Sequence, residues 1–132
     1  MDSIARHSGF PDHGSLAHFD QLATPIWVFD VDRHQIWWAN PAALEFWEAA
    51  TLAELQQRDF SSDSDMVRTR LRQIVSLANG SERLQDTWTL YPNDVPKTVI
   101  LSFLPVVIEG GVSAVLIEVK QFIDQCADAE AI

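Results

Sequence analysis

The chain has 132 residues, enough for one domain, and a formal net charge of -10 from 19 acidic and 9 basic residues. This charge repels a phosphate backbone, and no lysine or arginine stripe offsets it, so direct binding of nucleic acid is not expected. No run of about 18 apolar residues could cross a membrane, and the N-terminus lacks a signal peptide's apolar core, which predicts a cytoplasmic protein without membrane contact.

Residues 1–14 mix glycine, proline, histidine and charged residues without periodicity, which predicts a flexible segment. Metal binding in this region would depend on His7, His13, His18 and Asp12. Their spacing matches no compact ligand pattern, so we expect no metal site.

A stripe of apolar residues at helical spacing follows this segment. It consists of Leu16, Phe19, Leu22 and Ala23. Thr24-Pro25 ends it, because the residue before a proline is pushed out of the α-helical conformation. The pattern predicts a short amphipathic helix that needs an apolar partner.

Two runs rich in β-branched and aromatic residues come next, Pro25 to Asp30 and His34 to Asn40, separated by a short polar turn. They predict a β-hairpin. The pattern becomes helical at Asn40-Pro41, where proline suits the first helical position and the asparagine side chain can cap the helix. This helix is expected to run to about Ala49, and the capping-box pattern of Thr51 to Leu55 predicts another short helical turn.

Both faces of the hairpin are apolar. Ile26 and Val28 point to one face. Trp27 and Phe29 point to the other, so a sheet covered on one side would leave aromatic side chains in water. The second face therefore needs a cover: the N-terminal helix, a second copy of the chain, or both.

Residues 61–65, SSDSD, are typical of helix starts, and they precede an apolar face at helical spacing. That face consists of Val67, Leu71, Ile74, Val75 and Ala78. Asn79-Gly80 ends the predicted helix. Arg68, Arg70 and Arg72 point mostly away from the apolar stripe, which favours a solvated face.

Beyond Gly80 the pattern has the period of strands in three runs, Arg83 to Tyr91, Lys97 to Ile108 and Val112 to Val119. The links between them are short and rich in turn formers. Short links imply antiparallel pairing, and helices grouped between the second and third strands imply an α+β domain. We predict a five-stranded antiparallel sheet with short helices on one face.

The order of these elements and the residues at the strand-to-helix switch resemble the PAS domain family, over about Leu16 to Val119. The family's I-x-Y-x-N-P-A element is similar to Ile36, Trp38 and Asn40 followed by Pro41-Ala42. Supporting matches are Glu54-Leu55, Asp59, Asn79-Gly80 and the long final hairpin. The chain departs from the family at Trp47 to Ala50, where Gly-Tyr is frequent, and at Pro92 to Pro96, which replaces an Asp-Gly turn.

The resemblance implies a sensory domain over residues 15–119, preceded by the flexible segment 1–14 and followed by a connector at 120–132. The Trp-Ala-Asn and Leu-x-x-Trp element of this chain is similar to that of PAS domains that precede diguanylate cyclase or phosphodiesterase modules in bacterial signalling proteins. The resemblance therefore implies that this domain belongs to a longer protein with a covalently linked output domain, which would be a diguanylate cyclase, phosphodiesterase, nucleotide cyclase or histidine kinase.

In a PAS-like fold, the ligand pocket would lie between the sheet and the helices at Pro41 to Ala50 and Met66 to Ala78. Its expected lining is mainly apolar: Val28, Trp38, Phe46, Val67, Leu71, Ile74, Trp88 and Phe103. Trp38 and Trp88 are the main ligand-contact candidates because each lies mid-strand in a pattern expected to face the helices, and Asn40 is a polar partner. A one-residue slip of register would reverse this face assignment.

Haem needs an axial ligand such as histidine, but the central helices have none and His34 lies in the hairpin turn, which argues against haem. A covalent flavin adduct needs a cysteine in the pocket, and the single Cys126 lies beyond the last strand. Non-covalent flavin, stacked on tryptophan, stays open. A small, mainly apolar molecule such as an acyl chain suits the lining better.

Catalysis has little support in the sequence. The acid pairs Asp30/Asp32 and Asp63/Asp65 flank a turn and cap a helix, and no phosphate loop or nucleophile motif is present. A cone-shaped enzyme of the ketosteroid-isomerase type would place a tyrosine in its cavity, whereas Tyr91 borders a turn. We expect a domain that is not an enzyme.

Two such functions stay open, and we predict the first. In the first, a small ligand occupies the pocket, and its occupancy is relayed through dimer and terminal-helix packing to the output domain. In the second, the domain is a ligand-free dimerisation and interaction module, which a side-chain-filled interior would favour. The residues expected to form a homodimer are Leu16, Phe19, Leu22, Trp27 and Phe29.

Overall fold

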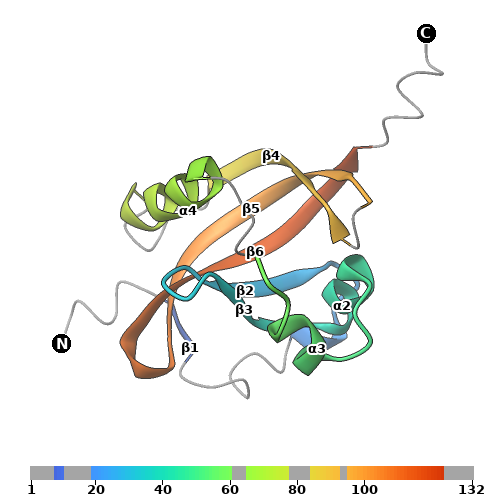
Figure 1. The fold of residues 1–132 in the computed structure, drawn as a ribbon, viewed down its shortest axis with the longest axis horizontal. Coiled ribbons are helices and arrows are strands. Elements are labelled where there is room, and N and C mark those ends of the chain that lie inside the picture. Colours follow the sequence, from blue (N-terminus) through green and yellow to red (C-terminus); the bar gives the residue numbers. More distant parts are fainter. Residues whose placement is uncertain (1–7, 11–18, 61–64, 78–83, 93–94, 124–132) are drawn as a thin grey trace, which may run out of the picture.

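The computed structural model describes residues 8–10, 19–60, 65–77, 84–92 and 95–123. In this part of the chain, six strands form one sheet, and helices cover one of its faces (Figure 1). The elements in chain order are β1 (Ser8–Phe10), β2 (Ile26–Asp30), β3 (Gln35–Ala39), α2 (Pro41–Trp47), α3 (Leu52–Gln56), α4 (Asp65–Leu77), β4 (Leu84–Leu90), β5 (Lys97–Ile108), the 3-10 turn η3 (Glu109–Gly111) and β6 (Val112–Ile123).

The sheet is the predicted antiparallel one, with one additional strand. Neighbouring strands lie in the order β3, β2, β6 and β5, and these pairs are antiparallel. Two strands share the remaining edge of β5: β4 pairs with residues 97–103, and β1 pairs in parallel with residues 106–108. Strand β1 falls in the segment expected to be flexible. It can pair there because β4 leaves that part of the edge open.

The observed elements agree with the predicted ones from β2 to β6, with differences at their ends. Strand β6 continues past its predicted end at Val119 to Ile123. Helix α2 ends at Trp47 rather than at about Ala49, because Glu48 adopts the left-handed conformation with φ 55°. Of the expected N-terminal helix, residues 19–21 form a single 3-10 turn, and residues 16–18 lie outside the described part.

Apolar side chains fill the space between the sheet and the helices, and we call this group the inner cluster. Its principal members are Trp27, Phe29, Phe46, Trp47, Leu55, Leu71, Ile74, Leu101, Phe103 and Ile117. A second group, the outer cluster, lies on the opposite face of the sheet: Ile26, Val28, Trp38, Val106, Ile108, Ala114 and Leu116. Both groups are buried, so both faces of the sheet are covered.

The assignment of the hairpin faces is corrected by this arrangement. Trp27 and Phe29 face the helices, whereas Val28 and Trp38, expected in the pocket, pack on the outer face. The alternation along β2 was correct, but both sets of side chains are apolar, so alternation could not tell which set faces inward. Helix α2 decides it, because it places Phe46 in a parallel stack on Trp27, with ring centroids 5.6 Å apart.

The N-terminal part of the chain supplies some of the cover on the outer face. Phe19 packs against the outer cluster, and its ring lies 6.3 Å from that of Trp38. Trp38 is buried as a result of such contacts. Part of the cover on the outer face therefore comes from the chain's own N-terminal residues.

Asn40 holds the start of the hairpin and the start of α2 together. Its Oδ1 accepts hydrogen bonds from the backbone N–H groups of Ile26 at 3.1 Å and Ala43 at 2.9 Å. Its Nδ2 donates to the carbonyl oxygens of Phe19 and Thr24, each at 2.9 Å. The predicted helix cap is confirmed, and the buried amide uses both acceptor and both donor positions on backbone groups.

Two basic side chains complete the other end of α2. Lys97, on β5, donates from Nζ to the Phe46 carbonyl oxygen at 3.1 Å. Arg58 donates to the carbonyl oxygens of Trp47 at 2.6 Å and Glu48 at 3.0 Å. Because the last carbonyls of a helix lack partners within it and carry partial negative charge, these cations fix how α2 sits on the sheet.

Candidate functional site

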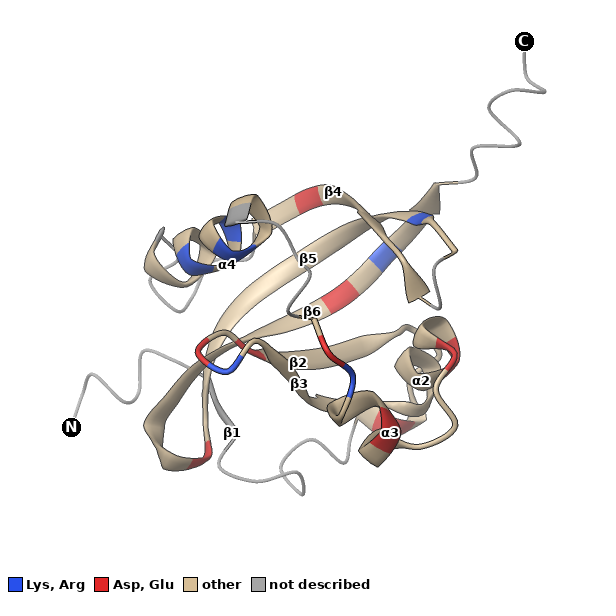
Figure 2. Cartoon of the chain, viewed as in Figure 1, with Lys and Arg blue, Asp and Glu red and all other residues tan. Residues whose placement is uncertain are grey.

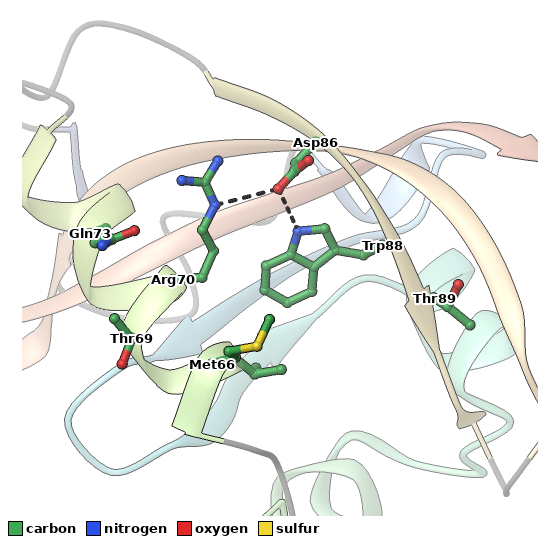
Figure 3. A pocket seen from close by; sticks show the side chains of 8 residues that line it. Met66, Thr69, Arg70, Gln73, Asp86, Trp88 and Thr89 are labelled. Carbon is green, nitrogen blue, oxygen red and sulfur yellow. Dashed lines mark hydrogen bonds and ion pairs between the residues drawn. The ribbon is translucent and has the colours of Figure 1, made fainter.

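An open groove lies between α4 and β4 and is the candidate site (Figure 3). Its lining residues are Met66, Val67, Thr69, Arg70, Gln73, Asp86, Trp88 and Thr89. Its volume of about 670 Å³ falls within the range of about 300 to 1,000 Å³ that is typical of small-molecule sites. The groove combines an aromatic and aliphatic wall with polar groups along its rim.

Helical and strand periodicity together create this groove. On α4, Leu71 and Ile74 are buried against the sheet, while Met66, with 81% of its surface exposed, lies at the solvent side. Side chains of β4 alternate between half-buried and exposed positions, so Asp86 and Trp88 share the face that looks toward α4. The groove therefore has one wall from each element.

The carboxylate of Asp86 connects the two walls. Its Oδ2 accepts a hydrogen bond from Trp88 Nε1 at 3.0 Å and lies 3.4 Å from Arg70 Nε (Figure 3). Its Oδ1 accepts from the Thr87 backbone N–H at 3.0 Å. The indole ring is thus held by two contacts, because it also packs against the ring of Phe103 at a centroid distance of 5.2 Å.

The residues predicted to line the pocket divide into three groups. Phe46, Leu71, Ile74 and Phe103 come together in the inner cluster. Val67 and Trp88 line the groove and also pack on that cluster. Val28, Trp38 and Asn40 lie elsewhere: the first two face the outer cluster, and the amide of Asn40 is saturated by the backbone, so it offers a ligand no free donor or acceptor.

The residues predicted for the homodimer are also separated. Trp27 and Phe29 are buried in the inner cluster, 2% and 6% exposed, so they cannot form a surface in the folded chain. Phe19 packs on Trp38, and Leu22 is 45% exposed. Leu16 lies outside the described residues.

Sequence reasoning missed the polar half of the groove. It assigned Arg70 to a solvated helix face and did not single out Asp86. The signal was present in β4, because residues two apart in a strand point to the same side and an aspartate next to a tryptophan can accept its N–H. What could not be read was that α4 would lie across this strand and bring an arginine to the same carboxylate.

Aromatic rings fill the interior beneath α2. Trp47 contacts the rings of Trp27 at 5.4 Å, Phe46 at 5.5 Å and Phe60 at 5.6 Å, each edge to face. The Trp47 Nε1 donor is buried there without a hydrogen-bond partner among the described residues. Such edge-to-face packing makes the interior beneath α2 dense.

The remaining chemical candidates are accounted for by position. His34 is buried in the hairpin turn, edge to face with Phe29 at 4.9 Å. Asp30 is buried at the same turn and accepts from the Arg33 backbone N–H at 3.0 Å. Asp63, Cys126 and the N-terminal histidines lie outside the described residues.

Two further properties concern the described part of the chain as a whole. Among its residues, no group of three or more histidine, cysteine, aspartate or glutamate side chains could hold a metal ion. None of its helices combines the length and the apolar character that crossing a membrane requires.

Comparisons with known proteins identify the fold and the family. The chain is similar to the PAS domain of nitrogen regulation protein NR(II) from Vibrio parahaemolyticus, with 17% identity and a TM-score of 0.58, covering 80% of this chain and 94% of that one. It is also similar to the PAS domain of an HTR-like protein from Haloarcula marismortui, with 21% identity and a TM-score of 0.60, covering 83% and 90% of the two chains. A third similar structure is the LOV protein of Rhodobacter sphaeroides, with 18% identity, a TM-score of 0.60 and coverage of 90% and 72%.

At these identities the structures show a shared fold. No curated protein matches the sequence. The family assignment comes from the sequence itself, since a PAS domain family model matches residues 16–85, more than half of the chain. By that match, the chain belongs to the PAS domain family.

Proposed function

We propose that this chain is a sensory and regulatory PAS domain that binds a small, flat, mainly apolar molecule in the groove between α4 and β4. The observation that carries the proposal is the indole of Trp88, which lines the groove and is oriented by a hydrogen bond to Asp86. A ring held in place loses little conformational freedom when a ligand stacks on it, so more of the contact energy appears as affinity.

A ligand in this groove would act on the contact between helix and sheet. The ion pair from Arg70 to Asp86 spans the groove, so an occupant that widens or tightens the groove changes the position of α4 relative to β4. Strand β4 pairs with β5, and β5 pairs with β6, which leads to the C-terminal connector. A difference of about 1 to 3 kcal/mol in ligand affinity between two arrangements would suffice for regulation.

PAS domains generally sense rather than catalyse, and this agrees with a regulatory role. We propose that the connector joins an output domain, since one similar structure is a domain of the sensory box sensor histidine kinase/response regulator from Geobacter sulfurreducens. We also propose a homodimer formed through the N-terminal residues Leu16, Phe19 and Leu22. Trp27 and Phe29 are removed from that interface because they lie in the inner cluster.

A second candidate function is a ligand-free interaction module. The observation that favours it is the dense interior, in which Trp27, Phe46 and Trp47 contact one another at ring distances between 5.4 and 5.6 Å. In this case the groove would be a surface feature, and the dimer alone would transmit the signal. The two functions differ in whether a small molecule binds the groove with an affinity that depends on Trp88.

The neutral fluorescent molecule N-phenyl-1-naphthylamine provides the test, because it is flat and apolar and its emission rises on leaving water. We expect saturable binding to the whole chain, weakened about tenfold by Trp88→Ala. Tyr91→Ala is the matched control, since Tyr91 is 62% exposed and lies outside the groove lining. Mass spectrometry of the purified protein, under native and then denaturing conditions, would show whether a natural ligand accompanies it.

Binding that is equal in Trp88→Ala and in the unaltered chain would remove the proposed site. Absence of saturable binding, together with a purified protein that carries no small molecule, would favour the interaction module. Unfolding curves of both variants separate a lost contact from a lost fold.

A further inference from the structure

Helix α4 is basic in an otherwise acidic chain. It contains Arg68, Arg70 and Arg72, three of the 9 basic residues, whereas the whole chain has 19 acidic ones. Figure 2 shows basic positions on α4 and single ones in the β2–β3 turn, after α3 and on β5 and β6, while acidic positions occur on α2, α3 and the strands. One wall of the groove is therefore locally positive.

Among the three arginines, Arg70 lines the groove. In the described part of the chain its ion-pair partner is Asp86, which is reached by Nε at 3.4 Å. Arginine has five N–H groups in a planar fork, and the four on its terminal nitrogens match the two oxygens of a carboxylate or sulfonate. Those four groups are not used by the contact with Asp86, and 41% of the arginine side-chain surface is exposed.

Both oxygens of the Asp86 carboxylate in the groove already accept from donors of the protein itself. Asp86 Oδ2 serves both Trp88 Nε1 and Arg70, and its Oδ1 serves the Thr87 N–H. The carboxylate is thus turned toward the protein's own donors. What the groove offers a ligand is an apolar ring surface beside arginine donors that the contact with Asp86 does not use, which favours an acceptor with negative charge over a cation.

We infer that the ligand of this groove is an aromatic or otherwise flat apolar acid, whose carboxylate or similar anion pairs with the terminal nitrogens of Arg70 while its body stacks on Trp88. This inference rests on the proposed function, because it names the ligand class for the same groove. The Met66 and Val67 side chains supply the apolar surface next to the ring. Asp86 has a positioning role, since it orients both the indole and the guanidinium.

A pair of probes that differ by one anionic group tests the inference. N-phenyl-1-naphthylamine and 8-anilinonaphthalene-1-sulfonate share their ring system, and the second carries the sulfonate. We expect the unaltered chain to bind the sulfonate probe about tenfold more tightly, the contribution of one charge-assisted hydrogen-bonded pair. Calorimetry and fluorescence titration measure both affinities.

Three variants assign this preference to a residue. Arg70→Gln is expected to abolish the preference for the sulfonate, and Arg70→Lys to keep part of it. Arg72→Gln is the matched control, because it removes the same charge from an exposed position of the same helix that does not line the groove. We expect it to change the affinity for the sulfonate less than twofold, as screening in salt weakens distant charges.

Equal losses in Arg70→Gln and Arg72→Gln would overturn the inference, because the helix as a whole would then attract the anion. So would equal affinity for the two probes in the unaltered chain. In both cases, neutral-probe binding that still depends on Trp88 would leave the proposed function standing. If neither probe binds in a way that depends on Trp88, the proposed function fails together with the inference.

Discussion

The Oδ1 atom of Asn40 lies 3.1 Å from the backbone nitrogen of Ile26, and this hydrogen bond ties the start of α2 to the start of β2. The same oxygen caps α2, and the amide nitrogen holds two carbonyls of the N-terminal segment. One buried side chain therefore organises three parts of the chain. Because Asn40 lies between the end of β3 and the start of α2, its hydrogen bonds place α2 over the sheet.

We expect Asn40→Ala to lower the free energy of unfolding by about 3 kcal/mol, because a helix cap is lost and buried backbone groups lose their partners. Urea unfolding followed by circular dichroism measures this. Thr51→Ala is the control, since Thr51 caps α3 through Glu54 N–H at 3.1 Å at an exposed position. It should cost about 1 kcal/mol or less. Equal costs for the two variants would contradict the central role of Asn40.

The reversed faces of the hairpin predict the behaviour of Trp27. Its ring is buried between Phe46 and Trp47, so Trp27→Ala should lower the free energy of unfolding by about 3 to 5 kcal/mol. Chemical denaturation measures the change. A variant of unaltered stability, combined with a change in sedimentation, would instead return Trp27 to a dimer surface.

The proposed homodimer gives a separate prediction at the N-terminal segment. Leu22 is 45% exposed, and a charge at its position would be buried without a partner if two copies met there. Leu22→Asp should therefore convert the dimer to a monomer in sedimentation equilibrium, with little effect on stability. Gln21→Asp adds the same charge at the neighbouring exposed residue and serves as control. A dimer that survives in both variants would exclude this interface.

The cation at the end of α2 should contribute measurably to stability. Lys97 Nζ donates to the Phe46 carbonyl and lies 5.1 Å from the centre of the same residue's ring. Lys97→Met should lower the free energy of unfolding by about 1 to 2 kcal/mol, because a charge-assisted hydrogen bond and a cation–π contact are lost.

The control for this prediction is Lys120→Met. Lys120 forms a surface ion pair with Glu118 at 3.8 Å, and such pairs contribute about 1 kcal/mol or less. Thermal unfolding of the two variants should therefore differ, with the lower midpoint in Lys97→Met. Equal midpoints would show that Lys97 contributes no more than an ordinary surface charge.

The sequence alone determined the family and the order of the elements, because these depend on local patterns. The strand-to-helix switch at Asn40-Pro41 requires a cap and a proline at the first helical position, and both are visible without a structure. The periods of β4 and α4 likewise gave the correct elements and their buried residues Leu71 and Ile74. Local hydrogen bonding and periodicity carry this information along the chain.

The tertiary structure decided which face of the hairpin is the interior and where the groove lies. Alternation is symmetric when both faces are apolar, so Trp27 and Trp38 could be exchanged until α2 placed its own rings on one of them. The pairing of Arg70 with Asp86 joins residues of two elements whose crossing no local pattern specifies. Packing between distant segments sets these relationships, because the same amphipathic elements could meet in more than one way until the whole core is filled.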